Sequence, residues 1–431
     1  MGTAAAVAAG GAALPYLFSC RRGPFERRPV SFRPYQPGKT AAPVTCVTPD
    51  DGFYIHTFYD VTPFSPSGRY LAVTRLPFQD HDPVLGETAD VCVIDLQTRE
   101  IFDVYSTRGW GFQLGANLNW GATDRTLYTN DVIDGCGVCV RLDLESGGVR
   151  AYSGPMYHIA PDESCVIGFP LDLINATQRG YGVPEDPDRP RVLPPGASGE
   201  QGLWRTELER DGKTLLLSLA QLADHVPDPD YYRGGTFYLF HSKFNRQNSR
   251  IMQVLRCMLP ERRGGWNPQL FTFDVNGANI RQAVTREQWA PGGHHPNWHP
   301  DGEHLIMNLK PDGETLRFCT FAYDGSGFRV LSEKRLGSGH PSVEASGRYL
   351  ISDAYPGEPV CKDSDQVPIR LVDLVVDDEI TLCTLYTLGR GLGTLRVDPH
   401  PAWDRNYSRV CFNGAPDGAR GVYIADLTGL I

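Results

Sequence analysis

Four histidines of this 431-residue chain share one position in a repeated sequence pattern. His241, His295, His340 and His400 each lie three residues before an aromatic or apolar residue, and the last three precede a proline. Neutral imidazole is the commonest metal-binding side chain, so several imidazoles at one point would suit manganese, zinc, iron or nickel. A His-Pro pair is also simply a good start for a turn, but a register shared by four histidines favours a common site.

The histidines belong to a unit that recurs along the chain. Its core is an aromatic or apolar residue, a turn of the Ser/Asp-Pro-x-Gly kind, and an alternating apolar strand, followed by further strands. The seven copies begin at Phe64, Trp120, Ile159, Phe244, Trp298, Val343 and Trp403. Four strands per unit, at a period of roughly 40 to 60 residues, is the pattern of a β-propeller. A unit this small cannot bury both faces alone, so the units must stack in a ring.

We therefore predict an all-β, seven-bladed β-propeller over residues 41–431. The last copy leaves room for about three strands, so a strand from residues 45–58 should complete the last blade and remove the free edge. Equal register in equivalent blades would place all four histidines at one mouth of the central channel. Long Pro-rich loops within residues 171–235 are expected to cover or line a site.

Composition limits the function classes. The net charge of −10 disfavours nonspecific binding to nucleic acid or to an anionic membrane. We also expect the protein to be a monomer. The 46 glycines and 34 prolines suit many tight turns and argue against long helices. Most of the 11 cysteines lie singly in apolar runs, which predicts buried free thiols, and Cys136 and Cys139 fit a hairpin loop better than a redox motif.

The first 40 residues differ from the rest. Residues 2–19 are small and apolar, like the second half of a twin-arginine export signal, and residues 17–20 form a loose lipobox ending in Cys20. Residues 21–39 are basic and Pro-rich, as in a linker. We expect residues 1–40 to be an export-signal remnant with a linker, the protein to be periplasmic or extracellular, and any membrane attachment to be a lipid anchor. The alternative is a disordered tail.

Further candidates follow from the antiparallel partner of each inner strand, which ends at the same face as the histidines. Asn130, Asp353 and Asn413 lie at such ends and are predicted substrate-binding residues. The guanidinium group of Arg75 or Arg256 could bind a carboxylate through two parallel N–H···O hydrogen bonds. A polar strand end next to water needs no function, which is the alternative for each.

Three further residues lie close to the inner ends of the strands. Tyr157 lies two residues before the third repeat start, close to the same rim, and is a catalytic candidate. Alternation along the strand points His294 and His299 away from the channel.

Several stretches together resemble a known family: residues 110–131, 179–182, 241–256, 337–342 with 352–356, and 398–403. They are similar to the seven-bladed propeller polysaccharide lyases, above all to the oligogalacturonate lyases and their ulvan-lyase and rhamnose–glucuronate-lyase relatives. The resemblance spans most of residues 45–431. It implies β-elimination at a uronic acid of an oligosaccharide or polysaccharide. That reaction needs a neutralised carboxylate, a base for the C5 proton and an acid for the leaving oxygen.

The resemblance also implies roles. In oligogalacturonate lyases a manganese-type ion is held by channel histidines and a glutamine, and His295, His340 and His400 match such positions. Manganese is expected first, with calcium or zinc as alternatives. His241 matches the histidine assigned to catalysis, as base or acid, and Arg256 would hold the carboxylate.

The chain departs from the ulvan-type pattern at two places. Tyr157 matches a family tyrosine, but Gln113 and Leu173 stand where a histidine and an arginine are expected. One alternative is therefore a non-catalytic TolB-like propeller that binds a glycan or a protein partner. Another is a glycoside hydrolase, which needs two facing carboxylates, for which Asp131 and Asp353 are the candidates.

Overall fold

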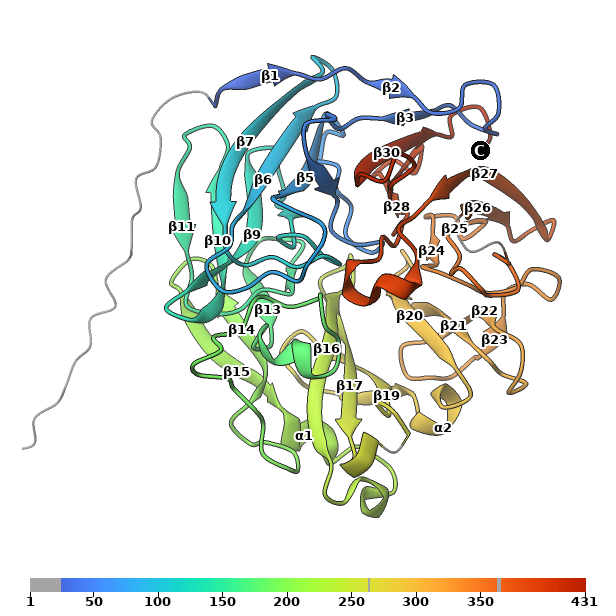
Figure 1. Cartoon of the computed structure of the whole chain (residues 1–431). Helices are drawn as coiled ribbons and strands as arrows, with labels where there is room; N and C mark the ends of the chain where they lie inside the picture. The colour runs from blue at the N-terminus through green and yellow to red at the C-terminus, as the bar shows by residue number, and fades with distance from the viewer. Residues whose placement is uncertain (1–24, 263, 363–365) are drawn as a thin grey trace, which may run out of the picture.

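The chain forms a ring of seven small sheets. The computed structural model describes residues 25–262, 264–362 and 366–431. These residues form seven antiparallel sheets of four or five strands, which follow one another in chain order around a central axis (Figure 1). The predicted seven-bladed β-propeller is confirmed. None of the helices in these described ranges is long and apolar enough to cross a membrane.

Each blade contains one copy of the repeat. Blade 1 contains β4 (Phe53–Ile55), β5 (Tyr70–Leu76), β6 (Ala89–Asp95) and β7 (Glu100–Thr107). Blade 2 contains β8 (Asn119–Trp120), β9 (Thr126–Ile133), β10 (Cys136–Asp143) and β11 (Val149–Ala151). Blade 3 contains β12 (His158–Ile159), β13 (Cys165–Gly168), β14 (Gly202–Glu207) and β15 (Gly212–Ser218).

The second half of the ring follows the same plan. Blade 4 contains β16 (Thr236–Phe244), β17 (Arg250–Met258), β18 (Gln269–Asp274) and β19 (Arg281–Val284). Blade 5 contains β20 (Gly293–Trp298), β21 (His304–Leu309), β22 (Arg317–Ala322) and β23 (Arg329–Val330). Blade 6 contains β24 (Ser342–Val343), β25 (Tyr349–Ser352), β26 (Gln366–Asp373) and β27 (Asp378–Tyr386), and blade 7 begins with β28 (Ala402–Trp403), β29 (Arg409–Gly414) and β30 (Gly421–Asp426).

The N-terminal region closes the ring. Strand β3 (Val44–Cys46) pairs with β30, and β2 (Arg33–Pro34) pairs with β3, so blade 7 is completed from the other end of the chain (Figure 1). Closure by an N-terminal strand was predicted for residues 45–58; β3 lies at the start of that range, and the rest of the range leads into β4 of blade 1. The pairing of β3 covers the outer edge of β30, which would otherwise be an unpaired strand edge.

The basic stretch predicted as a linker also contributes strands. Besides β2, it supplies β1 (Arg27–Pro29), which pairs with β7 at the outer edge of blade 1. Residues 2–19 and Cys20, to which the export-signal and lipid-anchor expectations refer, lie outside the described residues.

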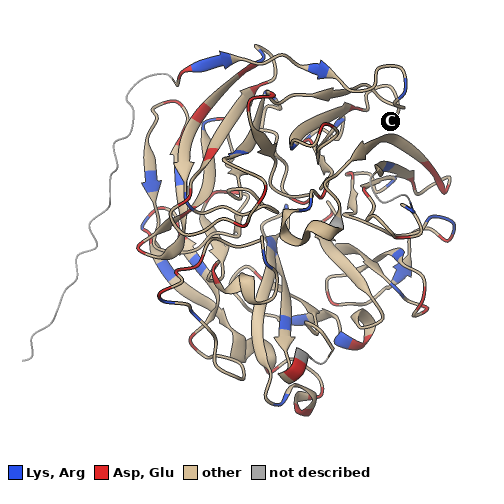
Figure 2. Cartoon of the chain, in the orientation of Figure 1, with Lys and Arg blue, Asp and Glu red and all other residues tan. Residues whose placement is uncertain are grey.

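A recurrent ion pair stabilises the outer turns. In blades 1, 2 and 6 an aspartate at the end of the third strand accepts hydrogen bonds from backbone N–H groups of the following turn. An arginine at the start of the second strand pairs with that aspartate: Arg69 with Asp95, Arg125 with Asp143, and Arg348 with Asp373. The local turn chemistry therefore repeats with the blade, which is why the repeat could be recognised in the sequence. Acidic and basic residues are interspersed over the blades (Figure 2).

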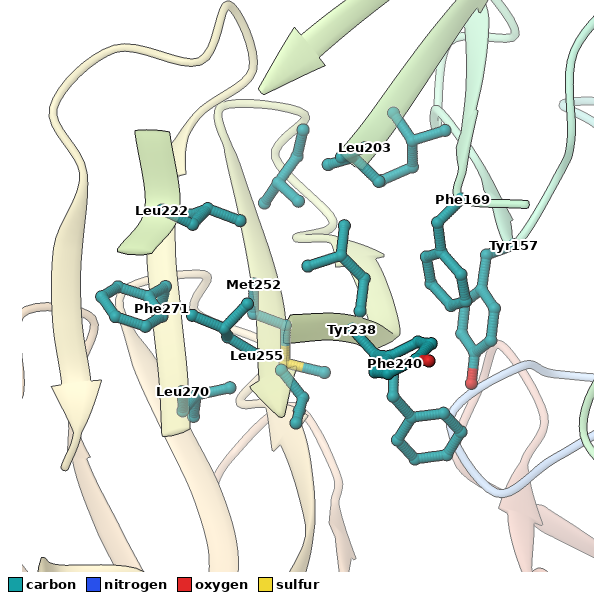
Figure 3. Close-up of a cluster of buried hydrophobic side chains, with 14 of the residues drawn as sticks. Tyr157, Phe169, Leu203, Leu222, Tyr238, Phe240, Met252, Leu255, Leu270 and Phe271 are labelled. Carbon is teal, nitrogen blue, oxygen red and sulfur yellow. The ribbon is translucent and has the colours of Figure 1, made fainter. Parts of the chain in front are cut away.

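Apolar side chains fill the space between neighbouring blades. The largest cluster joins blades 3, 4 and 5, and Figure 3 shows side chains of blades 3 and 4 that belong to it. Of the ten cysteines in the described ranges all are free, and only Cys136 is exposed. The prediction of buried free thiols is confirmed, and Cys136 begins β10 at the tight turn after β9, as expected of a hairpin.

We expect ring closure to depend on the backbone of residue 47. The Val47 N–H donates to the Val422 carbonyl at 3.0 Å, and both residues are buried. Val47→Pro removes this donor and leaves a buried acceptor unpaired, which should lower the free energy of unfolding by about 1–3 kcal/mol more than Val47→Ala does. Chemical denaturation of both variants measures the difference, and equal losses would show that the closure hydrogen bond contributes nothing.

Candidate functional site

Backbone conformation turns the inner-strand histidines out of the regular strand pattern. His241, His295 and His400 adopt φ values of 63°, 60° and 49°, in the left-handed region that non-glycine residues rarely occupy. The strand register shifts beside His241 and His295, as at a β-bulge, which redirects a side chain. Before His340, Gly339 takes the left-handed conformation instead, with φ 64°. Such strain concentrates at functional sites.

The four imidazoles converge on the channel axis. The ring centres of His295 and His340 lie 3.8 Å apart, and those of His340 and His400 lie 4.4 Å apart. His241 completes the ring of histidines around Phe58, whose ring centre lies 4.6 to 6.4 Å from all four imidazoles. The equal register in the sequence therefore corresponds to a common place in the structure.

Phe58 belongs to a segment that crosses the channel. The inner strand of blade 1 pairs with β5 at residues 53–55 and again at Phe64, so residues 56–63 leave the strand between these points. Blades 2, 5 and 7 hold this segment: the Leu118 N–H donates to Thr57 Oγ1, the Tyr59 hydroxyl donates to the Pro296 carbonyl, and the His56 N–H donates to Asn413 Oδ1. We call residues 56–63 the channel segment.

A buried cluster beside the channel segment could hold a metal. One donor atom each from His340, Asp398 and His400 lie within 4.8 Å of one another. His340 Nδ1 lies 2.9 Å from both carboxylate oxygens of Asp353, which also accepts the backbone N–H groups of His340 and His400. This bond orients the His340 ring and directs its Nε2 lone pair away from Asp353, an arrangement common around metal-binding histidines.

The residues of this cluster fit a divalent cation. Both ring nitrogens of His400 are buried without a hydrogen-bond partner, which is costly unless a ligand satisfies one of them. Burial and the neighbouring His340 hold the pKa of His400 well below its ordinary value, so the imidazole is neutral and able to ligate. Two imidazoles with one carboxylate suit manganese or zinc better than calcium, which prefers oxygen ligands.

The cluster that could hold a metal shares His340 and His400 with the predicted ligand set. His295 lies outside the group of close donor atoms. Its Nδ1 lies 2.7 Å from the Gly339 carbonyl and its Nε2 lies 3.2 Å from the Tyr355 hydroxyl, which is also 3.3 Å from His340 Nε2. Asp398 was not among the predicted ligands, although its place two residues before His400 was the available signal.

A cavity of about 450 Å³ opens beside the histidines. Its lining includes the predicted residues His241, Arg256 and His295, together with Tyr355 and Arg396, which were not predicted. The cluster that could hold a metal does not line this cavity, but Tyr355 does and also reaches His340. His294 lines the cavity too, against the expectation from alternation, because the bulge at His295 breaks that alternation.

Arg256 is a cation in the wall of the cavity. Its guanidinium lies between the rings of Phe240 and Trp266, 4.2 and 4.6 Å from their centres, and donates to Gln178 Oε1. Burial lowers the pKa of Arg256 to about 9. Within the described ranges no carboxylate lies within 4.0 Å of this guanidinium, in contrast to Arg75 or Arg396. A buried cation without a counter-ion favours binding of an anion.

Two loops complete the cavity wall. Gln178 and Tyr181 come from the long excursion between β13 and β14, which the sequence predicted to line a site. Gly393 and Arg396 come from the turn η4 (Arg390–Leu395), drawn in orange-red near the ring centre in Figure 1, and its end. Gln113, which stands where an ulvan-type histidine is expected, donates to the carbonyls of Thr394 and Arg396 and supports this turn.

The predicted substrate-binding residues do not line the cavity. Arg75 pairs with Asp90 and Asp103 on the outer strands β6 and β7, because these carboxylates lie across the sheet from it. Asp353 lies beneath His340, and Asn413 holds His56 and the Asp398 carbonyl. Asn130 is buried in blade 2. Asp353 and Asn413 therefore support residues around the channel, whereas Arg75 belongs to an ion pair within blade 1.

The remaining candidates are also buried in the blades. Tyr157 stacks on Phe169 in the core (Figure 3), 6.1 Å from the His241 ring, and its hydroxyl has no hydrogen-bond partner. Leu173 lies in the same core cluster. Asp131 accepts the Tyr105 hydroxyl and pairs with Arg108, and Asp353 is bound to His340, so these two carboxylates do not form the facing pair of a glycoside hydrolase.

Comparison with other proteins supports the fold. No model of a protein family and no curated protein matches the sequence. Among solved structures, an oligogalacturonate lyase in complex with manganese matches with a TM-score of 0.68 and 17% identity, over 94% of this chain and 98% of that one. The oligogalacturonate lyase from Vibrio parahaemolyticus matches with a TM-score of 0.67 and 15% identity, over 94% and 99% of the two chains. The chain therefore has the seven-bladed fold of these lyases.

We expect the purified protein to bind about one manganese ion per chain, because the three donors match the number that an open metal site needs. His340→Ala and His400→Ala should abolish binding, whereas His295→Ala should retain it. His299→Ala is the control, since His299 pairs with Asp301 at the surface. Metal analysis after incubation with manganese and gel filtration gives the stoichiometry. Wild-type protein that retains no manganese, zinc or calcium would exclude the site.

Proposed function

We propose that the protein is a lyase that cleaves uronic-acid oligosaccharides or polysaccharides by β-elimination. The observation that carries the proposal is the buried guanidinium of Arg256, which has no carboxylate partner within the described ranges and lies in the same cavity as His241. An anion-binding group beside a buried imidazole is what the reaction needs, since a uronate must have its carboxylate neutralised before its C5 proton can leave. The fold shared with two oligogalacturonate lyases supports the same chemistry.

Arg256 binds the uronate carboxylate in this proposal. A guanidinium offers two parallel N–H donors to a carboxylate, and its stacking between Phe240 and Trp266 fixes the plane of the fork. Neutralising the carboxylate lets negative charge from C5 spread onto it as the C5–H bond breaks. The low polarity of the aromatic walls strengthens the interaction.

His241 accepts the C5 proton. It is buried, lines the cavity and reaches the same space as Arg256. Burial lowers the pKa of His241 below the ordinary 6.5, so the ring is neutral at neutral pH and has a lone pair available. General-base catalysis by such a group contributes about 10²- to 10⁴-fold in rate.

His340, Asp398 and His400 would hold a divalent ion, which would supply further positive charge near the cavity. Of the chain's own residues, Tyr355 links this cluster to the cavity, because it lines the cavity and contacts both His295 and His340. Manganese is the first candidate, and zinc or calcium are alternatives.

We also propose that the enzyme is exported and acts as a monomer on glycans in the periplasm or outside the cell. The basis is the small-residue N-terminal sequence and the acidic net charge of −10, which argues against nucleic acid as a partner.

Loss of the carboxylate clamp should abolish most activity. We expect Arg256→Ala to lower kcat/KM on oligogalacturonate by about 10²- to 10³-fold, as for loss of one transition-state donor. Arg75→Ala is the matched control and should change kcat/KM by less than about twofold, because a surface ion pair contributes little. The ultraviolet absorbance of the unsaturated product measures both. No product from any uronate polymer or oligomer would contradict the proposal and favour a binding role.

The acid limb of the activity profile should report His241. The ring must be neutral to accept a proton, so activity falls as pH drops through its pKa. Because burial lowers that pKa below 6.5, activity should persist at pH values where an exposed histidine base would already be protonated. The pH dependence of kcat/KM, measured with manganese held saturating, gives the limb. An acid limb well above 6.5 would contradict His241 as the base.

A further inference from the structure

A carboxylate from the channel segment binds the proposed base. Asp60 Oδ2 lies 2.6 Å from His241 Nε2, and Asp60 Oδ1 lies 3.0 Å from Lys243 Nζ. The side chains of Asp60 and His241 are 1% exposed and that of Lys243 is 4% exposed. The three groups are therefore largely shielded from solvent, and a hydrogen bond between charged groups is stronger in such surroundings than in water.

The position of Asp60 is held by its neighbours. The channel segment makes a tight turn in which the Val61 N–H donates to the Phe58 carbonyl. Tyr59, directly before Asp60, donates its hydroxyl to the Pro296 carbonyl of blade 5. His241 and Lys243 are two residues apart on the bulged end of β16 in blade 4. A segment from blade 1 is thus fixed across the channel against blade 4.

The charge state of Asp60 determines the tautomer of His241. Burial raises the pKa of Asp60, but the charges of Lys243 and His241 outweigh it and hold that pKa well below the ordinary 3.8. An ionised carboxylate can only accept hydrogen bonds. His241 Nε2 must therefore carry the hydrogen, and Nδ1 is the ring atom left to accept a proton.

We propose that Asp60 is a positioning residue that fixes the orientation and tautomer of His241, so that Nδ1 is the atom that takes the C5 proton. The inference rests on the lyase function proposed above. In the step, the C5–H bond breaks and its proton goes to Nδ1, while its electron pair forms the C4–C5 double bond. The C4–O bond breaks, and the leaving oxygen keeps the electron pair of the C4–O bond and takes a proton from water. The hydroxide that remains is neutralised by the proton that the imidazolium later releases. Asp60 then stabilises the imidazolium.

Lys243 has a separate effect in this network. In the resting state it balances the charge of Asp60, so that the buried group is neutral overall. The titratable groups that face or influence His241 are Asp60, Lys243, Arg256, Tyr59, Tyr157 and His158. Among these, Asp60 raises the pKa of His241, and Lys243 and Arg256 lower it.

The tautomer can be measured without any assay of activity. In protein labelled with ¹⁵N-histidine, the His241 signals, assigned by their loss in His241→Gln, should show a protonated Nε2 and an unprotonated Nδ1 at neutral pH. Asp60→Asn should abolish this pattern or mix the two tautomers. Asp95→Asn is the matched control, because it removes a buried carboxylate that pairs with Arg69 in blade 1, away from His241. A wild-type His241 protonated at Nδ1 would overturn the inference.

Kinetics test the consequence for catalysis. We expect Asp60→Asn to lower kcat by about 10²-fold or more while KM changes only a few-fold, since Asp60 orients the base and does not line the cavity. The acid limb should move to lower pH in Asp60→Asn and to higher pH in Lys243→Met, because Asp60 raises the pKa of His241 and Lys243 lowers it. A purely structural role would change thermal stability and leave the limb in place, and that result would overturn the inference.

The two proposals fail in different ways. If wild-type protein shows no lyase activity on any uronate, the proposed function is wrong, but the ¹⁵N signals still decide whether Asp60 sets the tautomer. If Asp60→Asn does not fold, two other results test whether Asp60 sets the tautomer of His241. These are the tautomer of His241 in the wild-type protein and the acid limb of the activity profile of Lys243→Met. Activity of Asp60→Asn equal to that of Asp95→Asn would overturn the inference and leave the lyase function standing.

Discussion

The left-handed backbone at the inner-strand histidines is the constraint on which the site depends. In a regular strand successive side chains alternate between the two faces of a blade, and few of them reach the axis of the ring. At His241, His295 and His400 the chain instead takes φ values of 49° to 63°, and the imidazoles meet around Phe58. Each such residue costs about 1–3 kcal/mol. The packing of seven blades on a common axis supplies the stability that maintains this strain.

The channel segment turns an open ring into two separate compartments. A second cavity of about 430 Å³ lies at the other mouth of the channel and is lined by Tyr59, Asp60 and Lys243 together with six of the seven residues that begin the repeats. Phe58 lines the first cavity, and Asp60 contacts His241 from the side of the second cavity. One eight-residue excursion therefore separates the two cavities, covers the metal cluster and orients the proposed base.

Periodic features could be predicted from the sequence, and features that depend on contacts between distant segments could not. The blades, the ring closure and the shared place of the four histidines follow from a local pattern that repeats with each turn. Asp60 and Asp398 act through partners set by three-dimensional contact, and Asp60 is 181 residues from His241. Arg75 matched the expected position but is held by Asp90 and Asp103 on neighbouring strands, which no pattern along one strand reveals.

The most direct test is the place of a bound uronate. A crystal structure of His241→Ala, which should bind substrate without cleaving it, with a galacturonate trimer and manganese would locate the carboxylate. The proposed function predicts a uronate carboxylate at about 3 Å from the Arg256 guanidinium, with C5 toward the space vacated by the imidazole. A sugar bound at the opposite mouth, among the residues around Lys243 and Arg246, with Arg256 still without an anion, would contradict it.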